Sequence, residues 1–330
     1  MIVTRTPLRI SFVGGGSDLP AYYNYNQGAV LSTTVNKYIY ISVNKKFDDN
    51  IRLSYSITEN EKFVKNIKHP IVKNVLKFLK INNQIEISSI SDIPSKGSGL
   101  GSSSSFTVGL TKALYSFLER EITKSDLAKF SSFVEINLCG EKIGKQDQYA
   151  AAYGGFNIIE FNKNEKVKVT PIVCKKRTIR QIEKSLIVFF TGMQRSSNDI
   201  LSRQSKNLRK TQNKKIISNM VNLVYELKRE IENDNILEFG EILDKNWNLK
   251  KQLASNISNF ELDELYSKGI KAGATGGKIL GAGNGGFLMF YANPKNHKDI
   301  IKALPKLKKV DFKFEKDGSR VVYWGNKKNG

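Results

Sequence analysis

Residues 94–105 read PSKGSGLGSSSS, and the segments on either side of this glycine- and serine-rich stretch decide the fold. The segment before it, IEISSI at 85–90, is rich in β-branched residues and predicts a strand. In the segment after it, helical spacing places five apolar side chains on one face, namely Phe106, Leu110, Ala113, Leu114 and Phe117. The sequence therefore predicts a strand, a glycine loop and a helix in succession.

A glycine loop that opens a helix is suited to binding phosphate, because the backbone N–H groups of the first turn have no partner within the helix. The positive end of the helix dipole favours an anion at the same place. A serine-capped helix start is the alternative, although the four consecutive serines after Gly101 exceed what capping requires. The loop is not a Walker A motif, which needs Gly-Lys followed by Ser or Thr, and Ser102 stands where a Rossmann turn has its last glycine.

Two other glycine-rich stretches compete as functional motifs. GGGSD, Gly14–Asp18, follows a segment, residues 1–13, that predicts a strand. Its glycines would let a ligand approach the backbone, and Asp18 could accept hydrogen bonds from sugar hydroxyls, unless the stretch is a simple hairpin turn. GAGNGG, Gly281–Gly286, matches G-x-G-x-x-G but precedes the apolar run FLMFYA instead of a helix. A dinucleotide-binding fold is therefore disfavoured, and a tight turn into a strand is the alternative for this stretch.

The remaining pattern predicts an α+β protein with two lobes. Residues 38–44 predict a strand, a helix should run from an N-cap at Ser125 to Leu138, and Gly140 should end it. A strand returns at 151–161 and helices dominate 195–270, with the following residues expected in the core: Leu223, Leu227 and Ile231. The C-terminal lobe should form an antiparallel sheet from GFLMFYA (286–292), VDFKF (310–314) and RVVYW (320–324). We place the boundary near 175–190, which gives lobes of 1–180 and 181–330.

Composition limits the classes of function. Hydrophobic residues make up 40% and charged residues 25% of the 330 residues, as in globular proteins. No apolar run approaches the roughly 20 residues that span a bilayer, and the start has no signal-peptide pattern, so we expect a cytoplasmic protein without membrane contact. Two separated cysteines, Cys139 and Cys174, and two histidines, His69 and His297, show no metal-ligand spacing. The sequence therefore lacks the ligand set of a zinc enzyme and the G-x-S-x-G motif of a Ser-His hydrolase.

The formal charge of +22 attracts polyanions such as nucleic acid or phosphorylated metabolites. The lysines are spread along the chain, and we see no basic cluster interleaved with aromatic residues and no nucleic-acid motif. A nucleic-acid-binding module is therefore the weaker interpretation, and a small phosphorylated ligand is preferred.

Three motifs in order resemble the galactokinase, homoserine kinase, mevalonate kinase and phosphomevalonate kinase (GHMP) superfamily. They read PLRISFVGGGSD near the N-terminus, PSKGSGLGSSSS in the middle and GGKILGAGNGGF late in the chain. Within it the heptose 7-phosphate kinases look most alike, through RTPLRISFVGGGSDLPAYY (5–23), GKQDQYAAAYGG (144–155) and TGMQRSS (191–197). The resemblance implies a ribosomal-protein-S5-like N-terminal lobe and a ferredoxin-like C-terminal lobe.

The resemblance also implies a set of site residues. The glycine loop would bind the phosphates of ATP through Gly97, Ser98, Gly99, Leu100, Gly101, Ser102, Ser103 and Ser104. Asp147, within GKQDQY, matches the catalytic Asp of the family, and Arg9 falls near the transferring group, where a structural ion pair is the alternative. Residues expected at the acceptor are Gly15, Gly16, Ser17, Asp18, Lys145, Arg195 and Gly283, with Lys142 as a further candidate for its phosphate.

Magnesium would bind Ser103 and a glutamate upstream of Asp147. Glu135 matches when Gly140 is aligned, but the spacing to Asp147 is one residue longer than expected, so Glu141 is a rival. Oxygen ligands suit Mg²⁺. Asn284 stands where the late motif has another glycine, and asparagine tolerates the left-handed backbone that the turn needs.

The reaction implied is ATP-dependent phosphorylation of the anomeric hydroxyl of D-glycero-D-manno-heptose 7-phosphate to the 1,7-bisphosphate, for nucleotide-activated heptose and surface polysaccharide. A kinase of the same scaffold acting on fucose, galactose or free heptose is the alternative, because motif spacing does not encode the shape of the pocket. A protein that binds ATP without turnover is a third interpretation, which the presence of Asp147, Ser103 and a glutamate opposes. A monomer and a homodimer are both compatible with the sequence.

Overall fold

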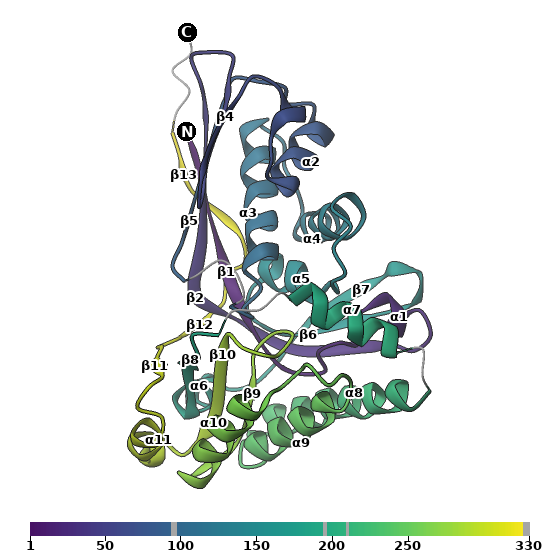
Figure 1. Cartoon of the computed structure of the whole chain (residues 1–330), viewed down its shortest axis with the longest axis vertical. Coiled ribbons are helices and arrows are strands. Elements are labelled where there is room, and N and C mark those ends of the chain that lie inside the picture. The colour runs from purple at the N-terminus through teal and green to yellow at the C-terminus, as the bar shows by residue number, and fades with distance from the viewer. Residues whose placement is uncertain (94–97, 194–196, 209–210, 326–330) are drawn as a thin grey trace.

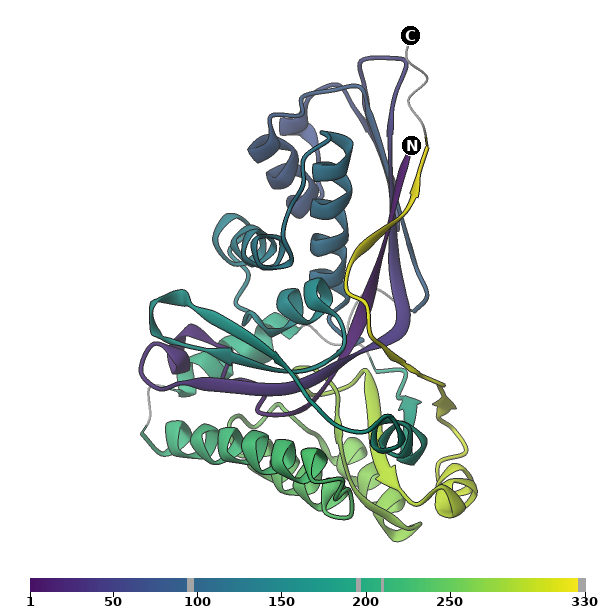
Figure 2. The same ribbon diagram turned by 180° about the vertical axis from the view of Figure 1, so that it is seen from behind.

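The computed structural model describes residues 1–93, 98–193, 197–208 and 211–325, and for residues 197 and 198 only the backbone. Two sheets organise these residues, one of nine strands and one of four. Figures 1 and 2 show the larger sheet standing upright, with helices on one side and the smaller sheet with its helices below. The predicted mixture of helices and largely antiparallel sheets is confirmed.

The larger sheet is built around two long strands, β1 (Ile2–Val13) and β2 (Gly28–Lys45). The sheet order is β13-β1-β2-β5-β3-β4, while β6 and β12 also pair with β2, and β7 pairs with β6. Its other strands are β3 (Ile51–Ser54), β4 (Thr58–Glu61), β5 (Ile85–Ser91), β6 (Phe156–Phe161), β7 (Val167–Pro171), β12 (Phe314–Glu315) and β13 (Arg320–Trp324). All pairs are antiparallel except β3 with β5.

β2 changes partners along its length. Residues 28–33 pair with β6, whereas residues 39–45 pair with β5. The register between β1 and β2 shifts between Pro7 and Leu8 and again between Ser11 and Val13, as at β-bulges, which bend strands. The lower part of the sheet consequently turns toward the smaller sheet (Figure 1). Residues 9–18 of the chain lie at this bend.

Helices α2 (Pro70–Leu79), α3 (Ser102–Phe117), α4 (Lys124–Phe133) and α5 (Gln146–Tyr153) cover one face of the larger sheet (Figure 2). α3 packs on β1 and β2 through its apolar face, on which Leu110, Ala113 and Leu114 are buried as predicted. The helix expected from an N-cap at Ser125 begins two residues earlier, because Thr123 is its N-cap and accepts a hydrogen bond from the N–H of Asp126. It ends at Phe133 and continues as a π-helix, Val134–Leu138.

The smaller sheet has the order β11-β8-β10-β9 and is antiparallel. Its strands are β8 (Leu186–Phe190), β9 (Ala274–Ile279), β10 (Phe287–Ala292) and β11 (Lys308–Lys309). The accompanying helices are α6 (Lys176–Ser185), α7 (Ser197–Asn207), α8 (Thr211–Glu232), α9 (Phe239–Lys251), α10 (Phe260–Lys271) and α11 (His297–Ala303). The three residues of α8 expected in the core are buried: Leu223, Leu227 and Ile231.

Two sequence predictions about strands were wrong. The segment 151–161 is not all strand, because Ala151–Tyr153 end α5 before β6 begins at Phe156. The segments 310–314 and 320–324 do not extend the smaller sheet: β12 pairs with β2, and β13 pairs with β1. The last strands therefore return to the larger sheet, beside the N-terminus (Figure 1). The lobe limits 1–180 and 181–330 stay a prediction.

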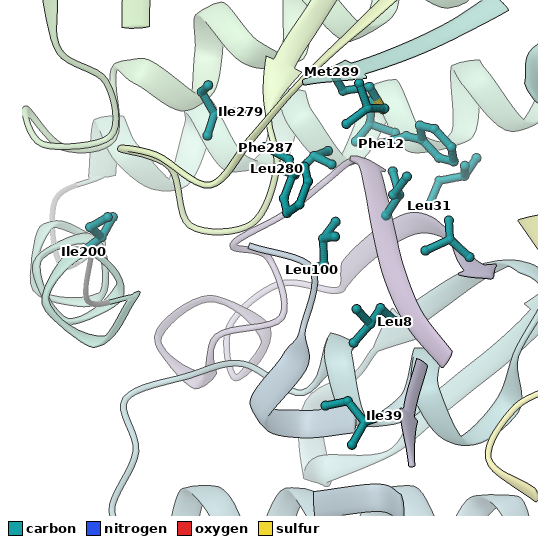
Figure 3. Close-up of a cluster of buried hydrophobic side chains, with 14 of the residues drawn as sticks. Leu8, Phe12, Leu31, Ile39, Leu100, Ile200, Ile279, Leu280, Phe287 and Met289 are labelled. Carbon is teal, nitrogen blue, oxygen red and sulfur yellow. The ribbon is translucent and has the colours of Figure 1, made fainter. Parts of the chain in front are cut away.

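One buried apolar cluster joins both sheets and the glycine loop. Phe12 of β1 and Leu31 of β2 share it with Met289 of β10. Leu100 of the glycine loop belongs to the same cluster and lies between Leu8 and the Leu280–Phe287 region in Figure 3. The loop is thus anchored at the junction of the two sheets by a side chain with no exposed surface.

Candidate active site

The glycine loop leads directly into the N-terminus of α3. Gly99 and Gly101 have φ angles of 74° and 75°, a left-handed conformation that glycine adopts at little cost. Gly101 is the N-cap, so the first N–H groups of this 16-residue helix have no intrahelical acceptor. Ser98 and Ser102 join their hydroxyl groups at 2.8 Å and brace the loop. Gly97 lies outside the described residues.

Arg9 of β1 holds the glycine loop through hydrogen bonds to two of its backbone carbonyls. Its N–H donates to the carbonyl of Leu100 at 3.0 Å, and its Nη1 donates to the carbonyl of Gly99 at 2.5 Å. The other two guanidinium nitrogens, Nε and Nη2, donate to the carboxylate of Asp147 at 2.8 and 2.7 Å. This is the bidentate arrangement that gives an arginine–carboxylate pair its strength and fixed geometry.

Asp147 lies in the first turn of α5, where the helix dipole favours a negative charge. A methyl group on Gly101 would come within 3.1 Å of Asp147 Oδ2, so the carboxylate lies against the glycine loop. Arg9 is only 3% exposed, whereas the side chain of Asp147 is 22% exposed. The ion pair offered as the alternative role for Arg9 therefore exists, and it aligns the aspartate that remains accessible.

A second carboxylate, that of Glu135, contacts the first turn of α3. Ser103 Oγ donates to Glu135 Oε1 at 2.8 Å, and the Gln148 amide donates to the other carboxylate oxygen. Glu135 belongs to the π-helix, a distortion that often occurs at functional sites. Burial raises the pKa of Glu135 to about 6, with Asp147 adding to the rise, while the hydrogen bonds from Gln148, Ser104 and Ser103 oppose it.

Ser103 and Glu135 fit magnesium, because both present hard oxygen atoms at one point. Among the described residues there is no group of three or more His, Cys, Asp or Glu side chains that could hold a metal. Mg²⁺ at phosphate sites usually takes only one or two protein ligands. The rival, Glu141, follows the π-helix and donates its backbone N–H to the carbonyl of Glu135 at 3.0 Å. The choice of Glu135 as ligand stays a prediction.

The GGGSD stretch begins the connection between β1 and β2, which also contains the short helix α1 (Pro20–Tyr23). Asp18 is 4% exposed and accepts hydrogen bonds from the N–H groups of Gly16 and Gln146 at 3.0 and 3.3 Å. Burial, and next the charge of Asp147, raise the pKa of Asp18. The hydroxyl of Ser17 both donates to and accepts from the backbone of Ala29, so it closes the turn.

The late glycine stretch forms the turn between β9 and β10, as its alternative interpretation predicted. A methyl group on Gly99 would overlap the carbonyl oxygen of Leu280, and one on Gly281 would come within 2.5 Å of Gly99 Cα. The two glycine stretches therefore touch through their backbones. Gly283 packs against Ile257, and Asn284 takes the left-handed conformation expected for it, with φ of 57°.

Of the three residues predicted to hold the phosphate of the acceptor, the structure describes Lys145 and Lys142. Lys145 forms an ion pair with Glu165 and lies over the ring of Tyr23, 5.1 Å from its centroid. Burial lowers the pKa of Lys145 to about 8. Lys142 is exposed, and Arg195 lies outside the described residues.

Four polar residues of the second half of the chain lie at the GGGSD stretch or at the end of β1 just before it, and they were not predicted from the sequence. Gly14 N–H donates to Asn246 of α9 at 3.1 Å, and Lys250, one turn later, is 4% exposed. Lys278 of β9 donates to the carbonyls of Ser11 and Phe12 at 2.8 and 2.9 Å.

Gln204 of α7, the fourth of these residues, is 1% exposed and lies so close to Gly16 that a methyl group there would overlap its amide. Among the described residues, neither the oxygen nor the nitrogen of that amide has a hydrogen-bond partner. One sequence signal existed: Lys250 continues the apolar face of Leu243 and Trp247 in α9, where an unpaired charge is unusual.

Comparisons with known proteins agree with this geometry. The family model of the GHMP kinases N terminal domain matches residues 66–155, and that of the GHMP kinases C terminal domain matches residues 227–309. A D-glycero-alpha-D-manno-heptose 7-phosphate kinase from Campylobacter jejuni is 33% identical, with 96% of this chain and 97% of that protein covered.

Two solved structures resemble the whole chain. A putative sugar kinase from Campylobacter jejuni has a TM-score of 0.78 at 31% identity, covering 97% of each chain. A D-glycero-D-manno-heptose 1-phosphate kinase from Bacteroides thetaiotaomicron has a TM-score of 0.81 at 24% identity, covering 99% of this chain and all of that one. The second likeness shows a common fold.

Proposed function

The chain belongs to the GHMP kinase family, and from this premise we propose that it phosphorylates the anomeric hydroxyl of D-glycero-D-manno-heptose 7-phosphate with ATP, giving the 1,7-bisphosphate. Its class, an ATP-dependent sugar kinase, follows from relatives that match it over nearly their full length. The observation that carries the proposal is the Arg9–Asp147 pair, fixed against a glycine loop at the N-terminus of α3.

The glycine loop would bind the phosphates of ATP with the backbone N–H groups of residues 98–104. The N–H groups of the first turn of α3 have no acceptor within the helix, and the helix dipole adds a favourable field there. Arg9 and Leu100 keep the loop in this conformation, so little reorganisation accompanies binding. Preorganised donors of this kind provide much of the catalysis in phosphoryl transfer.

Asp147 would accept the proton of the anomeric hydroxyl. As that oxygen bonds to the γ-phosphorus, the bond from phosphorus to the β,γ-bridging oxygen breaks and ADP leaves. Arg9 keeps both carboxylate oxygens of Asp147 aligned through two hydrogen bonds. No covalent enzyme intermediate is required.

Ser103 and Glu135 would hold Mg²⁺, which when bound neutralises charge on the phosphates of ATP. Gln148 keeps the Glu135 carboxylate turned toward Ser103 by donating to its second oxygen. Asp18, with Gly15 and Gly16, would contact the hydroxyls of the acceptor, because the carboxylate lies beside Gln146 at the start of the helix that carries Asp147.

The proposed setting is a cytoplasmic enzyme, monomeric or homodimeric, that supplies nucleotide-activated heptose synthesis for surface polysaccharide. No helix among the described residues is long and apolar enough to cross a membrane. The net charge of +22 suits a substrate that carries its own phosphate.

The test is ADP release from MgATP with heptose 7-phosphate, mannose 6-phosphate, free heptose, fucose, galactose and mevalonate, beside a control without acceptor. We expect turnover with heptose 7-phosphate far above the other acceptors. Turnover with only a free sugar would keep the kinase and replace its substrate by the alternative. Tight ATP binding without turnover on any acceptor would contradict the proposed reaction.

A further inference from the structure

Lys250 lies where all three glycine stretches meet. Its ammonium group donates to the carbonyl of Gly281, whose backbone touches Gly99 of the glycine loop. A methyl group on Gly15 would lie 4.0 Å from the Lys250 nitrogen. The side chain is 4% exposed, so the whole length of this lysine is enclosed between α9 and the loops.

The charges around Lys250 belong to the proposed reaction centre. The ammonium group of Lys250 interacts electrostatically with the charged groups of Arg9, Asp18 and Asp147. It also interacts with the ammonium group of Lys278. Arg9 uses its guanidinium on Asp147 and Gly99, and Lys278 donates to two backbone carbonyls. Both of these cations are thus already engaged by the protein.

Lys250 has spare donors. Within the part of the chain that the structure describes, the carbonyl of Gly281 is its hydrogen-bond acceptor, and no carboxylate lies within 4.0 Å of its nitrogen. An ammonium group has three N–H donors, and burying a charge with few partners is costly. A lysine kept in such a place is suited to an anionic oxygen that arrives with a ligand.

We propose that Lys250 is a catalytic residue that donates to the transferring phosphoryl group. The inference rests on the proposed function. Two phosphates could supply the anionic oxygen, the γ-phosphoryl group of ATP and the phosphate of the acceptor. The geometry favours the first, because Lys250 donates to the carbonyl of Gly281, whose backbone packs on Gly99 of the glycine loop.

In the transfer step Lys250 stays protonated. Its charge would offset the negative charge on the non-bridging oxygens of the phosphoryl group while the bond to the acceptor oxygen forms and the bond to ADP breaks. The proton of the acceptor hydroxyl goes to Asp147, so no proton leaves Lys250. The residue would act together with Arg9, which is committed to aligning Asp147.

The first experiment compares Lys250→Met, which keeps the length of the side chain and removes its charge, with Lys245→Met, an exposed lysine on the same helix. We expect kcat to fall about 100-fold in Lys250→Met, the loss typical of one donor to a transition state. The KM for the acceptor should change less than about threefold, whereas the KM for ATP should rise by about tenfold, because the bound γ-phosphoryl group loses a contact. Lys245→Met should match the wild type. A kcat within about threefold of the wild type would overturn the proposal.

The acceptor distinguishes the two phosphates. If Lys250 serves the transferring group, the loss in kcat is the same with heptose 7-phosphate as with free heptose. A rise in KM confined to the phosphorylated acceptor would assign Lys250 to the phosphate of the acceptor and contradict the proposal.

A binding measurement separates this proposal from the choice of acceptor. Calorimetry without any sugar gives the preference for adenylyl imidodiphosphate over ADP. That preference should shrink about tenfold in Lys250→Met, since it reports a contact to the third phosphate. An unchanged preference would refute the proposal even if no sugar in the panel were turned over.

A structural role for Lys250 is tested by restoring its charge. Lys250→Cys treated with 2-bromoethylamine regains a side chain of lysine length, and kcat should recover at least tenfold, with the treated wild type as control for Cys139 and Cys174. Circular dichroism shows whether both variants are folded. Folded but unrescued protein would point to packing at Gly281 instead of charge.

Discussion

At the residue scale, the site depends on two carboxylates, those of Asp147 and Glu135, each held in place by a different side chain. Arg9 holds the carboxylate of Asp147 with two hydrogen bonds, and Gln148 donates to the carboxylate of Glu135. Adjacent residues of α5, Asp147 and Gln148, therefore serve different carboxylates. A shift of this helix by one residue would disturb both.

The first prediction concerns Asp147→Asn. The amide still accepts a hydrogen bond from Arg9 but cannot take a proton, so kcat should fall about 1,000-fold, within the range typical of losing a positioned base. The fold should remain, and KM for ATP should change little. Steady-state kinetics of Asp147→Asn check this, with Asp299→Asn as the control, because Asp299 is an exposed aspartate of α11. Activity within about tenfold of the wild type would exclude Asp147 as the base.

The second prediction concerns pH and magnesium. The pKa of Glu135 lies at about 6, raised mainly by burial from the ordinary value of 4.5, so the carboxyl becomes protonated as pH falls through about 6. The Mg²⁺ concentration for half-maximal activity should then rise, by about tenfold per pH unit below that pKa. Activity titrated with Mg²⁺ from pH 7.5 to 5.5 tests this, and Glu135→Gln should need more Mg²⁺ at every pH. A wild-type requirement that does not change with pH would contradict the ligand role.

At the element scale, the two glycine turns act as a pair. The glycine loop carries φ angles that favour glycine, and the β9–β10 turn approaches it without a side chain between them. Leu100 and Leu280 on the flanks enter one core. The phosphate-binding loop is therefore positioned by the smaller sheet as much as by its own helix.

The third prediction tests that contact. In Gly99→Ala the new methyl group overlaps the carbonyl of Leu280, whereas Gly140→Ala has nearly the same φ, 73°, and no atom within 4 Å. Gly140→Ala should lose about 1 kcal/mol of stability from backbone strain alone. Gly99→Ala should lose about 2 kcal/mol more and raise KM for ATP, because the loop must move. Thermal unfolding measures the stability of the two variants, and ATP titrations measure their KM for ATP. Equal losses of stability in Gly99→Ala and Gly140→Ala would contradict the contact between the two turns.

The fourth prediction concerns α9 and how much the buried charge of Lys250 lowers the free energy of unfolding. Burial lowers the pKa of Lys250 from 10.5 to about 8, with the charge of Arg9 acting in the same direction. Between pH 8 and 10.5 the unfolded chain holds the proton that the folded state has lost, so the wild type gains stability as pH rises. Lys250→Met should be more stable than the wild type by about 2 kcal/mol at pH 7, after losing the hydrogen bond to Gly281.

Denaturant unfolding of Lys250→Met and wild type at pH 7, 8.5 and 10 measures this difference. It should shrink as pH increases, while Lys245→Met stays equal to the wild type throughout. A Lys250→Met protein that is less stable than the wild type at pH 7 would show that the lysine is needed for packing.

At the scale of the whole molecule, the last strands of the chain pair with its first two strands. β13 pairs with β1, and β12 pairs with β2, so the larger sheet needs strands from both ends of the sequence. The shared core also contains residues of both sheets (Figure 3). We therefore propose that the lobes 1–180 and 181–330 are parts of one folding unit.

The fifth prediction follows from that closure. A protein of residues 1–180 lacks β12 and β13 and leaves Phe12 of β1 without its ring contacts to Phe239 of α9 and Phe314 of β12. It should give no cooperative thermal transition by circular dichroism, whereas the full chain should unfold in a single transition. A cooperative transition of the fragment alone would show that the lobe is independent.

The sequence by itself determined the local elements. β-branched and apolar residues at 85–90 and 106–117 fix a strand and a helix, and the glycines between them fix a left-handed loop, because these are properties of neighbouring residues. The motifs also indicated the family, which the comparisons confirm. Assignments at Gly97 and Arg195 fall outside the described residues.

Only the tertiary structure decided which side chains meet. Motif spacing left Glu135 and Glu141 as rivals, and a distortion into a π-helix turns Glu135 to Ser103. Gln204 and Lys250 gave little local signal, because helices far along the chain bring them to the GGGSD stretch. Such contacts depend on how helices and sheets pack against one another, and periodicity within a segment carries no information about the partner.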